Sequence, residues 1–329
     1  MKILYVDLKF EYGDPSRGIN QIGEFGFHQV FKSLGHDVVT FYYEEYLKKT
    51  SELQSLLLGV ADKENPDLIF FSLYTNQFEV QTLNKLTSKY KTINWFGDDQ
   101  WRFDSFTKKY AKCFTYSITT DPFAIPKYKG MGYENVILSQ WAALNAVAPN
   151  GEKSYKYDIS FVGGSHSVRR WIVQEFKKQG LHVNTFGFGW PKGPVSLAEM
   201  QNIFLQSKIN LNLSNSVNWD IRYLLHSWKN ILVRAKSKKT VNQMKARNFE
   251  IPYFEGFQLA EYLPTIENYF DIGKNIVCYS NVDEAIQLAK FYLENHDLRE
   301  KIKSQSIIHV HLQHTYLHRF EKIFKQIGL

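Results

Sequence analysis

The sequence predicts an α/β protein with two domains, each built around a parallel β-sheet. Short apolar runs alternate with helical patterns from the first residues onward, which is typical of parallel strands joined by crossover helices. The runs are continuously apolar, as in strands of sheets that are covered on both faces. A length of 329 residues is enough for two separate cores. The polar segment 149–156 interrupts the alternation once, and we place the domain boundary there.

The first half contains six candidate strands and three candidate helices. The helices are expected at 19–34, 45–60 and 77–89, and the second is followed by the turn sequence Asn65-Pro66. The strands are expected at 3–8, 38–43, 67–73, 92–96, 113–120 and 135–140. These elements define a first domain of residues 1–150.

The second half repeats the alternation after the polar segment. Strands are expected at 158–164, 182–188, 209–214, 256–262 and 275–280. Residues 281–295 and 297–328 have the pattern of terminal helices, and the end of the second could cross back onto the first domain. We therefore expect a second domain over residues 151–312 and a C-terminal helix over residues 313–329 that packs toward the first domain.

The composition indicates a globular cytoplasmic protein. Apolar residues make up 44% and aromatic residues 16% of the chain, far more than a disordered chain carries. Asp7 interrupts the first apolar segment before a signal-peptide core can form, and no apolar run reaches the length of a membrane span. Cys113 and Cys278 are far apart in the sequence, which favours reduced thiols over a disulfide framework or a zinc site.

The net charge of +7 favours acidic partners, which can be nucleic acids, anionic membranes or phosphorylated small molecules. The basic residues are dispersed and accompany no nucleic-acid-binding motif, so we expect no nucleic-acid partner. Segment 219–239 places apolar residues at helical spacing among cations. Such a helix can lie on a membrane surface, or it can pack against the core with a solvated cationic end.

The segment 245–262 combines two cations, a carboxylate and a glycine turn. Lys245 and Arg247 can offer positive charge to a diphosphate. Glu250 lies three residues after Arg247, on nearly the same helical face, and can accept hydrogen bonds from ribose hydroxyls. Gly256 is expected to turn the chain into the next strand. Alternatively, Glu250 is a helix-surface carboxylate that pairs only with Arg247.

Two further segments follow predicted strands. FVGGSHSVRR at 161–170 opens a helix, so its backbone N–H groups and helix dipole form a candidate anion site near Gly163, Gly164 and Arg169. The alternative is a tight turn without a ligand. NWFGDDQWRFD at 94–104 places Asp98 and Asp99 where open α/β sheets bind ligands.

The two carboxylates of Asp98 and Asp99 could hold Mg²⁺ or remove a proton from an acceptor hydroxyl. Alternatively, one aspartate caps the following helix and the other pairs with Arg102. The loop after the first strand adds Arg17, and the helix after it carries Glu24 and His28. Histidine is suited to base catalysis at neutral pH, although His28 can equally be a structural residue.

The chain resembles the CgeB-like, spore-maturation-type glycosyltransferases, a GT-B group related to the GT4 enzymes. The resemblance spans nearly the whole chain and is most specific at 94–104 and 245–320, including LENHDLREKIKSQSIIHVHLQHTYLHRF. It implies two Rossmann-like domains that face each other across a cleft, with the C-terminal helix crossing back. It also implies transfer of a sugar from a UDP- or GDP-type nucleotide sugar to a saccharide or lipid-linked acceptor.

The resemblance further implies a metal-independent enzyme that needs no cofactor and acts in bacterial surface-polysaccharide or glycoconjugate synthesis. Because such acceptors are often lipid-linked, the protein could lie peripherally on the inner membrane face through 219–239. Two alternatives stay open, a GT-B-fold nucleotide-sugar epimerase and a non-catalytic nucleotide-sugar-binding protein. Donor turnover without an acceptor would indicate the epimerase.

The resemblance assigns roles to the candidate residues. The diphosphate would be bound by Arg17, Gly163, Gly164, Arg169, Lys245 and Arg247, and the ribose by Glu250. Asp98, Asp99 and His28 would form the catalytic, acceptor-side group. Related GT4 enzymes carry a sugar-contacting glutamate eight residues before the ribose-binding one, but this chain has Asn242 there. The choice between retention and inversion therefore stays open.

Overall fold

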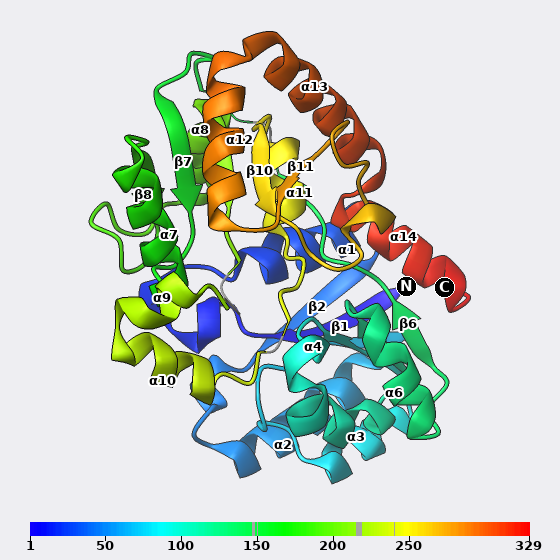
Figure 1. Cartoon of the computed structure of the whole chain (residues 1–329). Helices are drawn as coiled ribbons and strands as arrows, with labels where there is room; N and C mark the ends of the chain where they lie inside the picture. Colours follow the sequence, from blue (N-terminus) through cyan, green and yellow to red (C-terminus); the bar gives the residue numbers. More distant parts are fainter. Residues whose placement is uncertain (147–148, 150, 215–218, 240) are drawn as a thin grey trace. The chain divides into compact units, whose positions relative to one another are not determined.

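The computed structural model describes the chain except residues 147–148, 150, 215–218 and 240 (Figure 1). It divides into two compact units, each an α/β unit with its own parallel sheet. Unit 1 consists of Met1–Asn145 together with Tyr316–Leu329, and unit 2 of Ala146–Thr315. The predicted boundary segment 149–156 includes residue 150, which lies outside the described residues.

Unit 1 contains a six-stranded parallel sheet with the order β2-β1-β3-β4-β5-β6. Its strands are β1 (Lys2–Asp7), β2 (Asp37–Tyr42), β3 (Leu68–Phe71), β4 (Lys91–Phe96), β5 (Tyr116–Thr119) and β6 (Val136–Leu138). All six predicted strands are confirmed. The order of strands changes direction between β1 and β3, and sheets of this type bind ligands outside the carboxyl ends of the strands at such a point.

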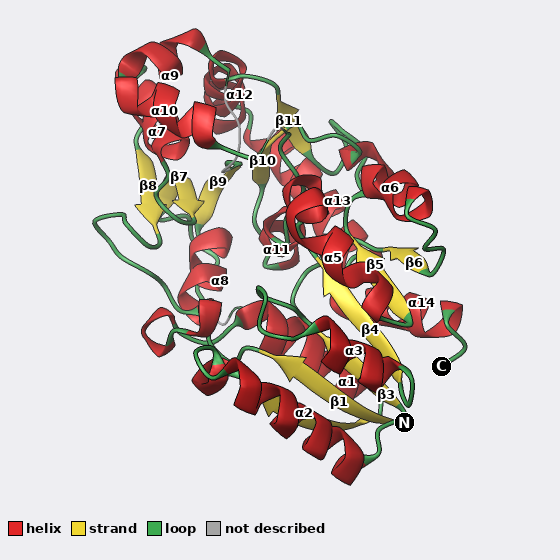
Figure 2. Ribbon diagram, turned by 90° about the horizontal axis from the view of Figure 1, so that it is seen from below, coloured by secondary structure: helices red, strands yellow, loops and turns green. Residues whose placement is uncertain are grey.

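Helices cover both faces of this sheet. They are η1 (Glu11–Gly13), η2 (Pro15–Arg17), η3 (Ile22–His28), α1 (Gln29–Ser33), η4 (Glu44–Tyr46), α2 (Thr50–Glu64), α3 (Val80–Thr87), α4 (Asp99–Arg102), η5 (Phe103–Thr107), α5 (Lys108–Tyr110), η6 (Ala111–Cys113), η7 (Pro122–Ala124), α6 (Ile125–Gly130) and α14 (Tyr316–Gln326). The helices α2 and α3 lie on one face (Figure 2), and their leucines are buried in one cluster with Leu4 and Ile69. On the other face, η3, α1 and α14 bury an aromatic cluster around Phe70.

The C-terminal helix α14 packs onto the first unit, as the sequence predicts. The ring of Phe320 lies 4.7 Å from that of Phe31 and 5.5 Å from that of Phe27. A Cβ added to Gly26 would come within 2.8 Å of the Tyr316 ring, so this glycine permits the close approach of α14 to η3. The single helix expected at 297–328 is wrong, because residues 314–315 are not helical and separate α14 from the preceding helix.

Unit 2 contains a five-stranded parallel sheet with the order β11-β10-β9-β7-β8. Its strands are β7 (Tyr157–Val162), β8 (Val183–Phe186), β9 (Ser207–Asn212), β10 (Gln258–Glu261) and β11 (Val277–Tyr279). Each predicted strand of this half is confirmed. Here the order of strands changes direction between β7 and β9, so the loops after these two strands flank the expected ligand position.

The helices of unit 2 are α7 (Ser167–Lys178), α8 (Leu197–Leu205), α9 (Ile221–His226), α10 (Trp228–Lys236), α11 (Arg247–Tyr253), η8 (Ile266–Asn268), α12 (Val282–Glu294) and α13 (His296–Gln313). Trp171 of α7 and Ala285 of α12 join Ile159 and Leu211 in one buried core. Met200 and Phe249 are buried outside that core, on α8 and α11, which contact β7, β9 and β10. The sheet is therefore covered on both faces.

The segment 219–239 forms two short helices instead of one. Ser227 has extended backbone and ends α9, and its hydroxyl accepts a hydrogen bond from the N–H of Lys229 at the start of α10. The core-packing interpretation does not hold for α10, since the side chains of Trp228, Ile231 and Leu232 are exposed. On α9, Tyr223 is buried in the core of unit 2.

The turn after α11 differs from the prediction. Glu255, not Gly256, has the left-handed backbone, with φ of 60°. The N–H of Gly256 donates to Ile251 O and that of Glu255 donates to Pro252 O, which is the Schellman pattern of a helix end. Gly256 is required for space, because an added Cβ would lie 2.7 Å from the Asn210 side chain.

Candidate functional site

Arg169 connects the loop after β7 with the loop after β9. These are the two neighbouring strands between which the strand order of the unit 2 sheet reverses. The Arg169 guanidinium donates to Gly164 O after β7 at 3.0 Å and to Leu213 O after β9 at 2.8 and 3.1 Å. Burial and the nearby positive charge of Arg247 lower the pKa of Arg169 to about 10. Because its donors bind backbone carbonyls, Arg169 shapes the site and contributes charge instead of pointing freely at a ligand.

The two glycines of the turn after β7 have different surroundings. A Cβ on Gly163 would lie 2.8 Å from the Phe161 ring, and the carbonyl of Gly163 accepts a hydrogen bond from Trp190 Nε1 at 2.9 Å. Gly163 is therefore required by the packing of the turn itself. A Cβ on Gly164 would meet only His166, at an ordinary 3.5 Å. Contact of either glycine with a pyrophosphate stays a prediction.

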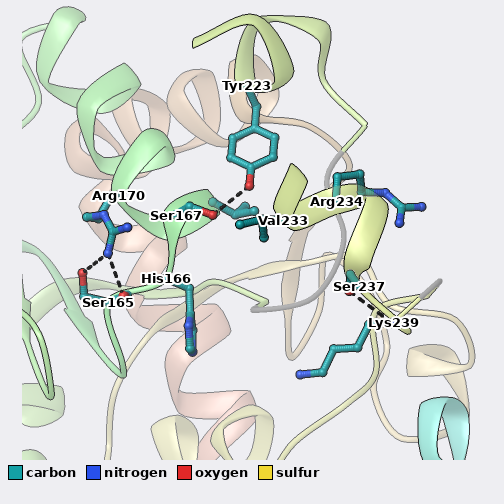
Figure 3. Close-up of a pocket in the computed structure, with 10 residues that line it drawn as sticks. Ser165, His166, Ser167, Arg170, Tyr223, Val233, Arg234, Ser237 and Lys239 are labelled. Atoms are coloured by element: carbon teal, nitrogen blue, oxygen red, sulfur yellow. Dashed lines mark hydrogen bonds between the residues drawn. The ribbon is translucent and has the colours of Figure 1, made fainter. Parts of the chain in front are cut away.

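A pocket of about 400 Å³ lies beside this turn, at the first turn of α7 (Figure 3). It is lined by Ser165, His166, Ser167, Val168, Arg170, Tyr223, Val233, Arg234, Ser237 and Lys239. Burial and the positive charges of Arg169, Lys239 and Arg170 lower the pKa of His166. The N-terminal dipole of α7 adds further positive potential, so the pocket favours an anionic ligand.

Hydrogen bonds fix the walls of this pocket. Arg170 Nη1 donates to the carbonyl of Ser165 at 2.8 Å and to its hydroxyl at 3.1 Å, and the hydroxyls of Ser167 and Tyr223 lie 2.8 Å apart. In Figure 3 the side chain of Lys239 extends from the opposite wall toward the side on which His166 lies. The walls thus come from the turn before α7, from α7, α9 and α10, and from the segment that follows α10.

Arg247 and Glu250 form an ion pair on α11, as their spacing predicts. Arg247 Nη1 lies 2.7 Å from Glu250 Oε2, and the guanidinium lies over the Phe204 ring of α8. Glu250 is buried instead of lying on the helix surface, and this burial raises its pKa although Arg247 opposes the shift. Arg247 donates to Oε2 of Glu250, so Oε1 can accept a hydrogen bond from a ligand.

Glu261 is a functional candidate that sequence reasoning missed. Its two oxygens accept hydrogen bonds from Asn242 Nδ2 at 2.6 Å and from the N–H of Ser214 at 3.1 Å. Burial raises the pKa of Glu261 to about 7, although these bonds and Arg169 oppose the shift. The available signal was its place at the end of the predicted strand 256–262, the position that also identified Asp98.

Unit 2 therefore gathers most of the predicted donor-binding residues at one end of its sheet. Ser214 connects Arg169 with Glu261, because its carbonyl accepts a hydrogen bond from Arg169 Nε at 3.3 Å and its N–H donates to Glu261 Oε2 at 3.1 Å. Lys245 begins the same segment, where its N–H donates to Asn248 Oδ1 at 3.0 Å. The remaining candidates, Arg17, His28, Asp98 and Asp99, belong to unit 1.

The two adjacent aspartates of unit 1 have different environments. Asp99 is 1% exposed and accepts hydrogen bonds from Thr107 Oγ1 at 2.6 Å and from Tyr128 OH at 2.8 Å. Burial raises the pKa of Asp99 to about 6. Asp99 is thus enclosed by protein, which makes it a poor candidate for the base that meets an acceptor.

Asp98 lines a pocket of about 130 Å³ at the carboxyl ends of β3 and β4. The other lining residues are Ser72, Leu73, Trp95, Phe96, Gly97, Arg102, Phe106, Thr107 and Trp141. The alternative assignment for the aspartates is wrong. The Asp98 side chain makes no capping hydrogen bond to α4, and Arg102 donates to Tyr74 O at 2.7 Å.

Arg17 lies in an aromatic group on unit 1. Its guanidinium lies over the Tyr12 ring at 5.1 Å, and the rings of Tyr12 and Tyr74 are 5.8 Å apart. Burial and the negative charges of Glu11 and Asp98 raise the pKa of Tyr12. Tyr12 and Tyr74 therefore connect Arg17 with the Asp98 pocket, and neither tyrosine was a candidate from the sequence.

His28 ends the π-helix η3, away from the aspartate pair in the sequence. Its Nδ1 lies 3.1 Å from Glu24 Oε2, and its ring is parallel to that of Tyr5. Tyr5 in turn donates to the buried carboxylate of Asp7, whose pKa is raised to about 7 by burial. These contacts favour a structural role for His28, while a catalytic role stays a prediction.

No group of three or more His, Cys, Asp or Glu side chains that could hold a metal ion occurs within residues 1–146, 149, 151–214, 219–239 and 241–329. Metal independence is not tested by this arrangement and stays a prediction, as does the expectation that no cofactor is needed.

Comparisons with known proteins agree with the geometry. Residues 169–325, just under half of the chain, match the glycosyl transferase-like family model. No curated protein sequence matches the chain. The matched range contains Arg169, the Arg247–Glu250 pair and Glu261, so the family match covers the gathered site of unit 2.

Solved structures resemble the whole chain. A glycosyltransferase from Rickettsia africae matches with a TM-score of 0.61 at 12% identity, covering 99% of this chain and 98% of that one. Sucrose-phosphate synthase from Thermosynechococcus elongatus matches with 0.62 at 9%, covering 99% of each. HepE from Anabaena in complex with UDP-glucose matches with 0.60 at 10%, covering 100% of this chain and 99% of that one.

These likenesses establish the fold as GT-B, with two Rossmann-like units. The family match supports a glycosyltransferase.

Proposed function

We propose that this chain is a CgeB-like glycosyltransferase that moves a sugar from a nucleotide-sugar donor to a hydroxyl of a saccharide or lipid-linked saccharide. We further propose a role in bacterial surface-polysaccharide or glycoconjugate synthesis. The observation that carries the proposal is the arrangement around Arg169. This residue ties the turn beside the cationic pocket to the loop after β9, within electrostatic range of Arg247.

The donor diphosphate is proposed to bind in the cationic pocket at the start of α7. When the bond between the sugar carbon and the diphosphate oxygen breaks, the electron pair stays on the diphosphate. Arg170, Lys239, Arg247 and the dipole of α7 would stabilise that charge, which is usually the largest contribution to catalysis of this kind. Oε1 of Glu250 would accept a hydrogen bond from a ribose hydroxyl.

The acceptor hydroxyl is proposed to lose its proton to Asp98. This carboxylate lines a pocket with Trp95 and Trp141, and aromatic walls with few polar groups are typical of small-molecule sites. Our proposal does not assign this role to Asp99, because its two carboxylate oxygens already accept hydrogen bonds from Thr107 and Tyr128. The proton would pass to the Asp98 carboxylate, which becomes a carboxylic acid, while the acceptor oxygen forms the new bond to the sugar.

We propose a uridine-type donor and metal-independent transfer. The uridine proposal is supported by the HepE structures, which were solved with UDP and with UDP-glucose. The metal-independence proposal is supported by the cations of the pocket, which can neutralise the diphosphate themselves. Activity that persists in excess EDTA would agree with it, and activity restored only by Mg²⁺ or Mn²⁺ would contradict it.

The decisive experiment is a thermal-shift titration with UDP and GDP, followed by turnover assays with a panel of UDP-sugars. Ligands that bind the folded state raise the melting temperature by an amount that grows with the logarithm of the ratio of ligand concentration to Kd. We expect UDP to stabilise the protein more than GDP does, and donor consumption to require an acceptor saccharide. Consumption without acceptor would indicate an epimerase, and stabilisation without any consumption a binding protein. The proposal fails if no nucleotide stabilises the protein at millimolar concentration.

A further inference from the structure

Trp219 and the helices α9 and α10, which are labelled in Figure 1, carry large exposed apolar side chains on unit 2. These side chains are between 44% and 73% exposed and come from Trp219, Ile221, Leu225, Trp228, Ile231, Leu232 and Val233. Two of them are tryptophans. We call this group the α9–α10 surface. Single exposed apolar residues are ordinary, but a contiguous group of this size usually marks an interaction site.

On α10 the apolar stripe faces outward. Trp228, Ile231, Leu232 and Ala235 follow the i, i+3, i+4, i+7 spacing that normally faces the core of a globular protein. All four side chains are exposed. The buried residue of this helix is the polar Asn230, whose Nδ2 donates to Tyr223 O at 2.9 Å. The helix is therefore held by its polar side and presents its apolar side.

The segment that carries the α9–α10 surface is positively charged. Residues 221–239 contain six Lys and Arg and no Asp or Glu. Arg222 is neutralised by Asp220 and Asp283, at 2.6 and 2.9 Å. The remaining cations lie on or just after α10, at Lys229, Arg234, Lys236, Lys238 and Lys239. A strongly cationic and apolar surface is complementary to a surface that is anionic and apolar.

We infer that the α9–α10 surface binds anionic lipid bilayers. The apolar stripe would enter the boundary between headgroups and acyl chains, while the lysines contact anionic headgroups. A second copy of the chain would bring like charges together, and a nucleic acid would leave the apolar stripe exposed. Among the residues described, no helix is long and apolar enough to cross a membrane, so α10 would lie in the plane of the interface.

The surface continues into the cationic pocket. Val233 and Arg234 of α10, and Ser237 and Lys239 after it, line that pocket while α10 carries the apolar stripe. Lipid binding would therefore bring a phosphate-binding pocket next to the headgroup layer. The binding inference itself does not depend on the transfer reaction.

Flotation of the full-length protein with liposomes tests the inference. Binding to vesicles with 30 mol% phosphatidylglycerol in phosphatidylcholine should exceed binding to pure phosphatidylcholine by about tenfold or more at low salt, and should weaken at about 0.5 M salt. The variant W228S/L232S should lose about thirtyfold in affinity because both apolar side chains leave the interface. The variant K236Q/K238Q should lose about thirtyfold as well, at roughly a factor of five per cation.

Matched controls come from the same unit. I308S/L312S removes another exposed apolar pair at i,i+4 spacing, on α13, and K177Q/K301Q removes two exposed lysines elsewhere. Both controls should bind vesicles as the wild type does. The inference is overturned if wild-type protein stays unbound on anionic vesicles at low salt, or if the controls lose as much affinity as the test variants. It is also overturned if W228S/L232S abolishes a dimer or binding to a DNA duplex while vesicle binding is unchanged.

Discussion

Replacing Glu250 by glutamine gives the sharpest test of the donor site, because two effects of opposite sign can be separated. Glu250 is 5% exposed, and its Oε2 pairs with Arg247 at 2.7 Å. If Oε1 accepts a hydrogen bond from ribose, E250Q loses about 1.5–3 kcal/mol of binding, which is about 10- to 150-fold in Kd. Removal of the negative charge also favours the diphosphate. A charge about 10 Å away at an effective dielectric constant of about 20 contributes about 1.7 kcal/mol.

Calorimetric titration with UDP, 2′-deoxy-UDP and 3′-deoxy-UDP separates the two effects, because all three ligands carry the same diphosphate. For the wild type, loss of the recognised hydroxyl should weaken binding by about tenfold or more. For E250Q the same hydroxyl should matter by less than about threefold, whatever the change in overall affinity. E175Q is a matched control, since Glu175 forms a similar i,i+3 pair with Lys178 at 2.6 Å on α7.

The reasoning would be refuted if E250Q discriminates between UDP and its deoxy forms as strongly as the wild type does. Glu250 would then be only the partner of Arg247, and ribose recognition would have to be sought elsewhere in unit 2. An E175Q variant that also lost discrimination would show that the effect is general and not specific to Glu250.

Three further predictions concern stability and catalysis. Asp99 has a folded-state pKa of about 6 against an ordinary 3.8, so the folded state binds more protons, and Asp99 should contribute about 3 kcal/mol to a fall in stability as pH rises from about 4 to 7. Asp7 and Glu261, whose pKa values are also raised to about 7, remain in D99N. Urea unfolding of D99N should therefore show a fall about 3 kcal/mol smaller than that of the wild type, and equal falls would contradict the assignment. G163A should lose about 1–3 kcal/mol in urea unfolding because its Cβ meets the Phe161 ring, whereas G164A should change by less than about 0.5 kcal/mol. D98N should lower kcat by about 10²–10⁴-fold with unchanged UDP affinity, and full activity would exclude this base.

Much of the fold could be predicted because its strands are continuous apolar runs, a pattern that needs no knowledge of distant contacts. The break between α13 and α14 could not, since residues 297–328 have helical periodicity throughout. The turn after α11 was assigned to Gly256, the glycine that precedes the predicted strand. In the structure Glu255 has the left-handed backbone, and Gly256 is required by its close approach to Asn210. Asn210 lies on β9, far from Gly256 in the sequence.

The candidate site was located by the rule that ligands bind at the carboxyl ends of parallel strands. This rule identifies a loop, but it does not say which of two adjacent side chains in that loop is accessible to a ligand. Asp98 and Asp99 are adjacent, yet only Asp99 is enclosed, and the residues that enclose it include Tyr128, from a helix beyond the next strand. Glu261 was missed for the same reason, because its burial and its raised pKa depend on Asn242 and on the loop after β9.

The helix α10 shows why an amphipathic pattern alone leaves the environment of a helix undecided. Trp228, Ile231 and Leu232 recur at a spacing that fits a protein core and a bilayer surface equally well, because both remove apolar area from water. The structure distinguishes a core helix from a surface helix through the polar face of α10. Asn230 is buried and bound to Tyr223 O, so the helix is already anchored when its apolar side points outward. Since the same helix supplies Arg234 to the cationic pocket, an acceptor carried on a lipid would meet the proposed donor site at the membrane surface.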